Sequence, residues 1–272
     1  MYKKKELLLK RYKESPRHWE KSILHQVPYT NDLYQGILDF LSKELNLNKL
    51  NEINNLFKFF KVSEFSPDEL SGVNFITKKL YNLPKDLKII YYKICNHILL
   101  KKKDFLIQRT PTIRVHFQDE NCYQFYPFWH SDLILGHPPF EKNIWIPLTK
   151  PYGNKYHGFS LSTPEISHKI FNQFCTKDPY LSKDNPRVIK NKEFLVNSEP
   201  CKCLPGEALE FDSRIFHSAL NFKNNLRLSL DIRIISRKYL NPPYPIYRGL
   251  GRMKMLFDEK NYFISEEELN NF

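Results

Sequence analysis

The first hundred residues carry apolar side chains at intervals of three and four, the spacing of an amphipathic helix. One such set shares a single helical face: Leu33, Ile37, Leu38 and Leu41. The stretch Ser66-Pro67-Asp68-Glu69 offers an N-cap serine, a proline at the first helical position and an acid three residues after the cap. Pro84 precedes a further amphipathic segment, residues 87–100. The pattern therefore predicts a helical layer over residues 1–104.

After about residue 105 the period changes to two, which is typical of strands with two different faces. In residues 227–234 every even position is Leu or Ile, and the odd positions are Arg227, Ser229, Asp231 and Arg233. Residues 112–117 and 143–148 alternate in the same way, with polar or aromatic side chains on one face: Thr112, Arg114, His116, Asn143 and Trp145. A polar strand face is commonly the solvated side of a sheet. Two arginines, a serine and an aspartate on one strand are more typical of a polar cavity lining.

These two patterns together predict an α+β fold, because the helices can cover the apolar faces of the strands. We expect one domain over residues 1–272, with the strand region at 105–240 and a helical insertion near 164–185. Pro205-Gly206-Glu207 is expected to form a turn that leads into a strand at 208–211. Residues 241–272 would form a C-terminal extension.

Composition narrows the class of protein. No apolar run approaches the roughly 20 residues that cross a bilayer, and the first residues lack a signal-peptide core, so we expect a cytoplasmic protein without a membrane segment. Five cysteines, an odd number, predict reduced thiols. The net charge of +12 lies mostly in residues 1–110, with 21 Lys and Arg against 12 Asp and Glu. Dispersed surface lysines explain this excess better than a nucleic-acid partner does.

The stretch that indicates chemistry is His130-Ser131-Asp132, followed 87 residues later by His217. Two imidazoles and one carboxylate leave positions open on an octahedral ion, the ligand set of non-haem Fe(II) oxygenases. An H-x-D alone arises by chance, and His217 alone could be a strand histidine without a metal. Arg227 and Ser229 strengthen the signal, because a guanidinium with a nearby hydroxyl is a good receptor for a carboxylate.

In these motifs the sequence resembles the Fe(II)/2-oxoglutarate-dependent dioxygenases, in the branch related to phytanoyl-CoA dioxygenase and to StrG-type proteins of streptomycin biosynthesis. The residues that carry the resemblance are 109–116, 130–132, 136–141, 143–149, 205–206, 216–217 and 227–229. The resemblance implies a double-stranded β-helix (jelly-roll) core with the N-terminal helices packed on its major sheet. It implies Fe(II) ligands at His130, Asp132 and His217, and binding of the distal carboxylate of 2-oxoglutarate by Arg227 and Ser229, with O2 as the oxidant. Because Asp132 is a carboxylate, hydroxylation rather than halogenation is expected.

Other polar residues of the strand region are expected near this site. Arg114, His116, Asn143 and Trp145 would line the keto-acid side, although His116 and Trp145 could instead be buried structural residues. His137 and Arg233 are candidates for contact with the substrate. For His137 the alternative is a loop histidine bonded to backbone, and for Arg233 it is an ion pair with Asp231 or another acid.

The sequence thus predicts an iron- and 2-oxoglutarate-dependent oxygenase that hydroxylates a small polar metabolite, such as a sugar, an aminocyclitol or a nucleotide-linked sugar. Two alternatives stay open. One is an oxidative demethylase of nucleic acid, suggested by the basic first half. The other is a metal-free jelly-roll protein that binds a ligand without chemistry.

Overall fold

The structure is a computed structural model. It describes residues 19–61, 65, 74–118, 129–133, 137, 140–150, 159–176, 198–219, 225–239 and 262–271. The described helices are α2 (Thr30–Glu44), a 3-10 helix (Ile53–Lys58), α3 (Phe75–Lys79), α4 (Lys85–Leu99), α5 (Pro164–Thr176), a 3-10 turn (Arg237–Tyr239) and α7 (Glu266–Leu269). The described strands are β1 (Ile23–Gln26), β2 (Phe105–Gln108), β3 (Thr112–Gln118), β4 (Lys142–Pro147), β5 (Phe159–Ser162), β6 (Ser198–Pro200), β7 (Glu207–Asp212), β8 (His217–Ala219), β9 (Asn225–Ser236) and β10 (Phe263–Ile264).

The strands form two antiparallel sheets. The larger sheet has the order β1-β7-β4-β9-β2-β10, and β3 pairs with β9 beside this path. The smaller sheet has the order β6-β5-β8. The 12-residue strand β9 is central to the larger sheet, because it pairs with β4 on one side and with β3 and then β2 on the other. The expected mixture of helices and antiparallel strands is confirmed.

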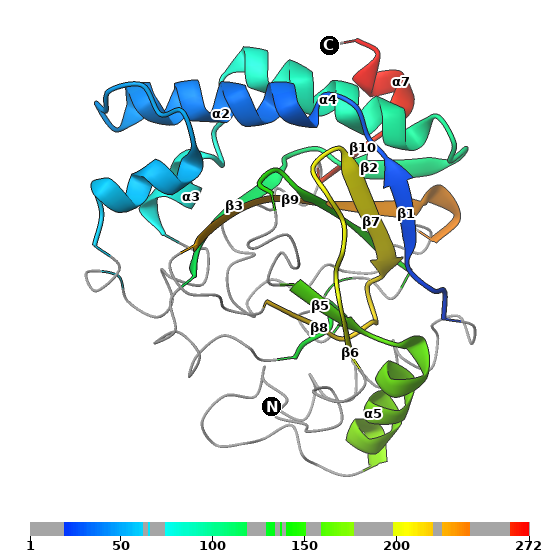
Figure 1. The fold of residues 1–272 in the computed structure, drawn as a ribbon. Helices are drawn as coiled ribbons and strands as arrows, with labels where there is room; N and C mark the ends of the chain where they lie inside the picture. Colours follow the sequence, from blue (N-terminus) through cyan, green and yellow to red (C-terminus); the bar gives the residue numbers. More distant parts are fainter. Residues whose placement is uncertain are drawn as a thin grey trace, which may run out of the picture.

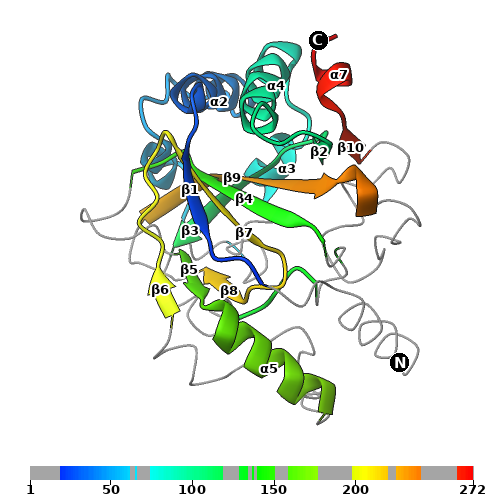
Figure 2. The same ribbon diagram turned by 90° about the vertical axis from the view of Figure 1, so that its right-hand side faces the viewer.

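The elements are arranged in layers (Figures 1 and 2). Helices α2 and α4 lie side by side over one face of the larger sheet, and the smaller sheet lies on the other side, with α5 beyond it. One apolar cluster joins the N-terminal helices to the larger sheet, with Leu33 and Tyr91 from the helices and Leu230 from β9 among its members. A second cluster includes Trp145 from the larger sheet, Phe159 from the smaller sheet and Ile170 from α5.

Helix α2 forms where the apolar spacing predicts it, and its buried side chains include Leu33, Ile37, Leu38 and Leu41. Gly36 of α2 faces Leu87 of α4. A Cβ atom placed on Gly36 would lie 2.2 Å from a methyl carbon of Leu87, far inside van der Waals contact. Any larger residue at position 36 would therefore require the Leu87 side chain to move.

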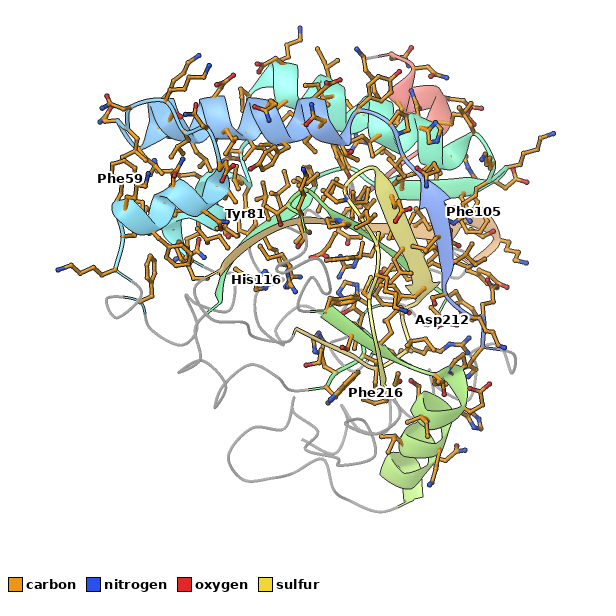
Figure 3. All side chains as sticks on the ribbon, viewed as in Figure 1. Phe59, Tyr81, Phe105, His116, Asp212 and Phe216 are labelled. Atoms are coloured by element: carbon orange, nitrogen blue, oxygen red, sulfur yellow. The ribbon has the colours of Figure 1, made fainter. Side chains whose placement is uncertain are left out.

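The period-two pattern correctly assigns the two faces of the strands. Ile113 and Val115 of β3 are buried in the cluster beneath the helices, together with the even-numbered aliphatic residues of β9. The polar residues of the same strands face the opposite side, toward the smaller sheet. Figure 3 shows His116 on this side of β3, below the sheet and away from the helices. One face of the sheet is thus core, and the other carries the polar side chains.

Several element boundaries differ from expectation. The layer at residues 1–104 is not wholly helical, because Ile23–Gln26 forms β1, which pairs with β7 at the edge of the larger sheet. The predicted helix start at residues 66–69 lies outside the described residues; α3 begins after Asn74, whose side chain accepts a hydrogen bond from the Thr77 amide. Of the insertion at 164–185, the described part is α5.

The turn before β7 is confirmed, with Gly206 at a positive φ of 94° that favours glycine. The C-terminal extension contributes β10, which pairs with β2. Cys95, Cys201 and Cys203 are free and buried. None of the described helices combines the length and the apolar composition that crossing a lipid bilayer requires.

Candidate metal centre

Backbone pairing brings the H-x-D stretch to the start of β8. The His130 amide donates to the His217 carbonyl at 3.0 Å, and the His217 amide donates to the His130 carbonyl at 2.8 Å. The amide of Asp132 donates to the carbonyl of Ser213 at 2.9 Å, in the turn between β7 and β8. One isolated β-bridge and a backbone hydrogen bond to the β7–β8 turn therefore bring residues far apart in the sequence together.

The three side chains converge. The ring centroids of His130 and His217 lie 4.3 Å apart, and His217 Nε2 lies 3.8 Å from Asp132 Oδ1. One ligand atom from each of His130, Asp132 and His217 lies within 4.8 Å of the others. The spatial meeting that the sequence predicts is therefore present, and its two nitrogens and one oxygen are donors that suit a divalent transition metal.

The protonation states suit metal binding. Burial alone would raise the pKa of Asp132. The opposing electrostatic attraction of Arg233, with smaller effects from His137, His217 and His130, holds the pKa well below its usual range, so the carboxylate is ionised. Burial lowers the pKa of His217 despite the opposing effect of Asp132, so its imidazole is neutral at pH 7. Its Nδ1 lies 3.1 Å from the Ile215 carbonyl, which can only accept. Nδ1 therefore carries the proton, and the Nε2 lone pair faces Asp132.

The polar face of β9 continues from this centre along the sheet. The strand register places Arg227 opposite His116, Ser229 opposite Arg114, and Arg233 opposite Asn143. All the residues predicted to bind or line the keto acid therefore lie on three adjacent strands, β3, β9 and β4. Their side chains share the face of the larger sheet on which the smaller sheet lies.

Arg227 is almost fully buried on this face. Its guanidinium nitrogen Nη2 lies 3.2 Å from His116 Nδ1, and its central carbon lies 5.9 Å from the centroid of the Trp145 ring. Burial lowers the pKa of Arg227 to about 10, so it remains a cation at neutral pH. Trp145 also stacks on Phe159 of β5, with centroids 4.8 Å apart, and so has a core role as well.

Two buried polar atoms on the same sheet face as Arg227 have no hydrogen-bond partner in the described part of the chain: the hydroxyl of Ser229 and the side-chain oxygen of Asn143. Buried polar atoms of proteins almost always have partners. The Ser229 hydroxyl can donate to a carboxylate oxygen, so Arg227 and Ser229 together fit a small anion such as 2-oxoglutarate.

The arginines further along the face have acid partners. Arg114 is partly exposed, and its Nε lies 2.7 Å from Asp231 Oδ2. Arg233 was predicted either to contact the substrate or to form an ion pair with Asp231 or another acid. The structure has an ion pair with Asp132, in which Nη2 of Arg233 lies 2.7 Å from Asp132 Oδ2. His137 likewise bonds to a side chain as well as to backbone, since its Nδ1 lies 2.7 Å from Glu141 Oε1. Contact of His137 or Arg233 with a substrate stays a prediction.

Glu141 is the residue that reasoning from the sequence missed. It is buried beside His137, and Asp132, His137 and Glu141 form a second group with ligand atoms within 4.8 Å of one another. The spacing of four residues between His137 and Glu141 was the available signal, but in a stretch without a helical pattern it did not point to contact.

Comparisons with known proteins give one short sequence match and several structural matches. The sequence matches no known protein-family profile. A stretch of 78 residues is 35% identical to the streptomycin biosynthesis protein StrG of Streptomyces griseus. The matched stretch makes up 28% of this chain and 38% of StrG, so this chain spans well under half of that relative's length. Among solved structures, the apo non-heme monooxygenase ThoJ has a TM-score of 0.43 at 10% identity over 84% of this chain and 77% of ThoJ. The α-ketoglutarate-dependent epimerase SnoN has a TM-score of 0.39 at 10% identity over 87% of this chain and 84% of SnoN.

Proposed function

We propose that this protein is a non-haem Fe(II)- and 2-oxoglutarate-dependent oxygenase. The observation that carries the proposal is the convergence of His130, Asp132 and His217 at the smaller sheet, which lies on the side of the larger sheet where β9 carries buried Arg227 and the orphaned hydroxyl of Ser229. A metal triad alone is compatible with several kinds of metalloprotein. A buried carboxylate receptor on the next strand adds the feature expected for a keto-acid co-substrate.

Each residue then has a defined task. His130, Asp132 and His217 would hold Fe(II) through two imidazole nitrogens and one carboxylate oxygen. Arg227 and Ser229 would bind the distal carboxylate of 2-oxoglutarate, with His116, Asn143 and Trp145 shaping that end of the cavity and Arg114 at its more exposed part. When bound, this metal centre with 2-oxoglutarate and O2 supplies the oxidation of a substrate C–H bond, coupled to decarboxylation of the keto acid.

The reaction that we propose is hydroxylation of a small polar metabolite such as a sugar, an aminocyclitol or a nucleotide-linked sugar. Support for hydroxylation comes from Asp132, which provides a protein carboxylate as a ligand. Support for a metabolite comes from the stretch shared with StrG, whose name places that relative in streptomycin biosynthesis. The branch related to phytanoyl-CoA dioxygenase remains part of this proposal.

We also propose that the two sheets are the halves of a jelly-roll core within one domain. After β3 in the larger sheet, the chain enters the smaller layer at the His130 bridge, returns in β4, and passes through β5 and β6. It then alternates again through β7, β8 and β9. Such alternation between two facing antiparallel sheets supports a double-stranded β-helix.

Anaerobic loading with Fe(II) followed by metal analysis tests the function. We expect about one iron per wild-type chain, and loss of iron and of substrate-independent succinate formation in Asp132→Ala and His217→Ala. His97→Gln is the control, because His97 lies on α4 and bonds to the Gln26 carbonyl on the helical side of the protein. Unchanged iron content in both alanine variants would overturn the assignment, and wild-type protein without iron would favour the metal-free alternative. A screen for metabolites that stimulate succinate formation, beginning with sugar nucleotides and amino sugars, then tests the substrate class.

A further inference from the structure

A buried group of ion pairs lies beside Asp132, on the side of its Oδ2 atom. Arg233 donates from Nη2 to Asp132 Oδ2 at 2.7 Å, and its Nε lies 3.6 Å from Glu141 Oε1. The same Glu141 oxygen lies 2.7 Å from His137 Nδ1. The side chains of Asp132, His137, Glu141 and Arg233 are all less than a tenth exposed. A cation and an acid are thus fixed beside the proposed metal ligand.

This network is not a second metal site, although Asp132, His137 and Glu141 have ligand atoms within 4.8 Å of one another. The guanidinium of Arg233 contacts both Asp132 and Glu141, and therefore already supplies the positive charge between the two carboxylates. A divalent ion in the same place would face a buried cation at contact distance, where repulsion is strong because the local dielectric constant is low. The network must therefore act through Asp132.

The two oxygens of Asp132 have different surroundings. Oδ2 accepts the short bond from Arg233, whereas Oδ1 faces His217 Nε2 at 3.8 Å. A charge-assisted bond of this length occupies Oδ2 and fixes the plane of the carboxylate. Backbone bonds reinforce the arrangement, since the amide of Asp132 donates to the Ser213 carbonyl and the Ser213 amide donates to the Glu141 carbonyl at 3.1 Å.

We propose that Arg233 is a positioning residue that restricts Asp132 to one-oxygen ligation of the metal, with Glu141 and His137 holding the guanidinium in place. The inference rests on the proposed function. One-oxygen ligation by Asp132 sets how many positions on the metal stay open for other ligands. On an octahedral ion, two imidazoles and one carboxylate oxygen leave three positions, which a chelating keto acid and O2 together require. A carboxylate that bound through both oxygens would leave only two.

Mn²⁺ in place of iron gives a readout that does not depend on activity. The water molecules on Mn²⁺ can be counted by electron–nuclear double resonance in isotopically labelled water, without 2-oxoglutarate. We expect three waters in the wild type and two in Arg233→Gln, because the freed Oδ2 turns toward the metal. Arg233→Lys keeps the charge but is too short to donate to Oδ2 at the same distance, so we expect two waters there as well.

Arg214→Lys is the matched control. Arg214 is also a buried arginine bonded to a carboxylate, with Nε 2.8 Å from Asp212 Oδ1, but Asp212 is not a proposed ligand. This variant should keep three waters. Three waters in a folded Arg233 variant of either kind would overturn the inference and leave the proposed function intact. Equal Mn²⁺ affinity in wild type and Asp132→Ala would overturn the metal site, and with it both proposals.

Discussion

Replacing Arg227 by methionine should stabilise the protein without ligand and abolish tight binding of 2-oxoglutarate. The Arg227 guanidinium is almost fully buried, and burial lowers its pKa from the ordinary value for arginine to about 10. Arginine is protonated at pH 7 in both the folded and unfolded chain, so the cost of burying the charge is fully present at every pH below about 10. Methionine has a similar length and carries no charge.

The size of both effects can be worked from the structure. The fall in the pKa of Arg227 to about 10 corresponds to roughly 3 kcal/mol of folding free energy, taken as an upper bound. Methionine also removes the contact with His116 Nδ1, worth about 1 kcal/mol. We therefore expect Arg227→Met to raise the free energy of unfolding by about 1–2 kcal/mol. Loss of the charge-assisted hydrogen bonds to the distal carboxylate should weaken the binding of 2-oxoglutarate by about 2–4 kcal/mol, roughly 30- to 700-fold in affinity.

Urea unfolding of the metal-free protein at pH 7 measures stability, and calorimetric titration of the Mn²⁺-loaded protein measures 2-oxoglutarate affinity. Arg214→Met is the control, because it should lower the free energy of unfolding where Arg227→Met raises it. Arg214 bonds to Asp212 through two guanidinium nitrogens, so its replacement leaves a buried carboxylate without its cationic partner and should cost about 3–5 kcal/mol. The reasoning is refuted if Arg227→Met unfolds at lower urea concentration than wild type, or if it binds 2-oxoglutarate within about threefold of wild type.

Two further predictions concern single polar residues. Ser229→Ala should weaken the binding of 2-oxoglutarate by about 1 kcal/mol, roughly fivefold, as measured by calorimetry. The unliganded protein should be at least as stable in urea unfolding, because a buried hydroxyl without a hydrogen-bond partner is removed. For Glu210, burial would raise the pKa, but Lys102 and Lys142 lower it below its usual range, so its stabilising effect exists above about pH 4.3 and is lost as pH falls. Glu210→Gln should therefore be less stable than wild type at pH 7, by about 2–3 kcal/mol. The difference should become smaller at pH 3 in urea unfolding, and a difference that is the same at both pH values would contradict this.

The sequence determined which side chains share a face. Strand period alone places Arg227, Ser229 and Arg233 together, because alternate residues of an extended chain point the same way. The same rule predicted His130 and Asp132 on one side, although the structure has Asp132 in a turn that follows the His130 bridge. Helix spacing predicted the buried face of α2 for the same local reason. These inferences succeed because periodicity depends only on neighbouring residues and on the contrast between apolar and polar side chains.

Only the tertiary structure decided which faces meet and in what register. Residues 23–26 are too few to show a strand period, and they are a strand because β7 offers its edge to them. Arg233 pairs with Asp132, 101 residues away, and not with the acid two residues before it, which binds Arg114 instead. Glu141 reaches His137 and Arg233 because the turn after β7 holds both Asp132 and Glu141 by backbone bonds. Partner choice across a sheet depends on register and burial, and neither property is contained in the local pattern of a single strand.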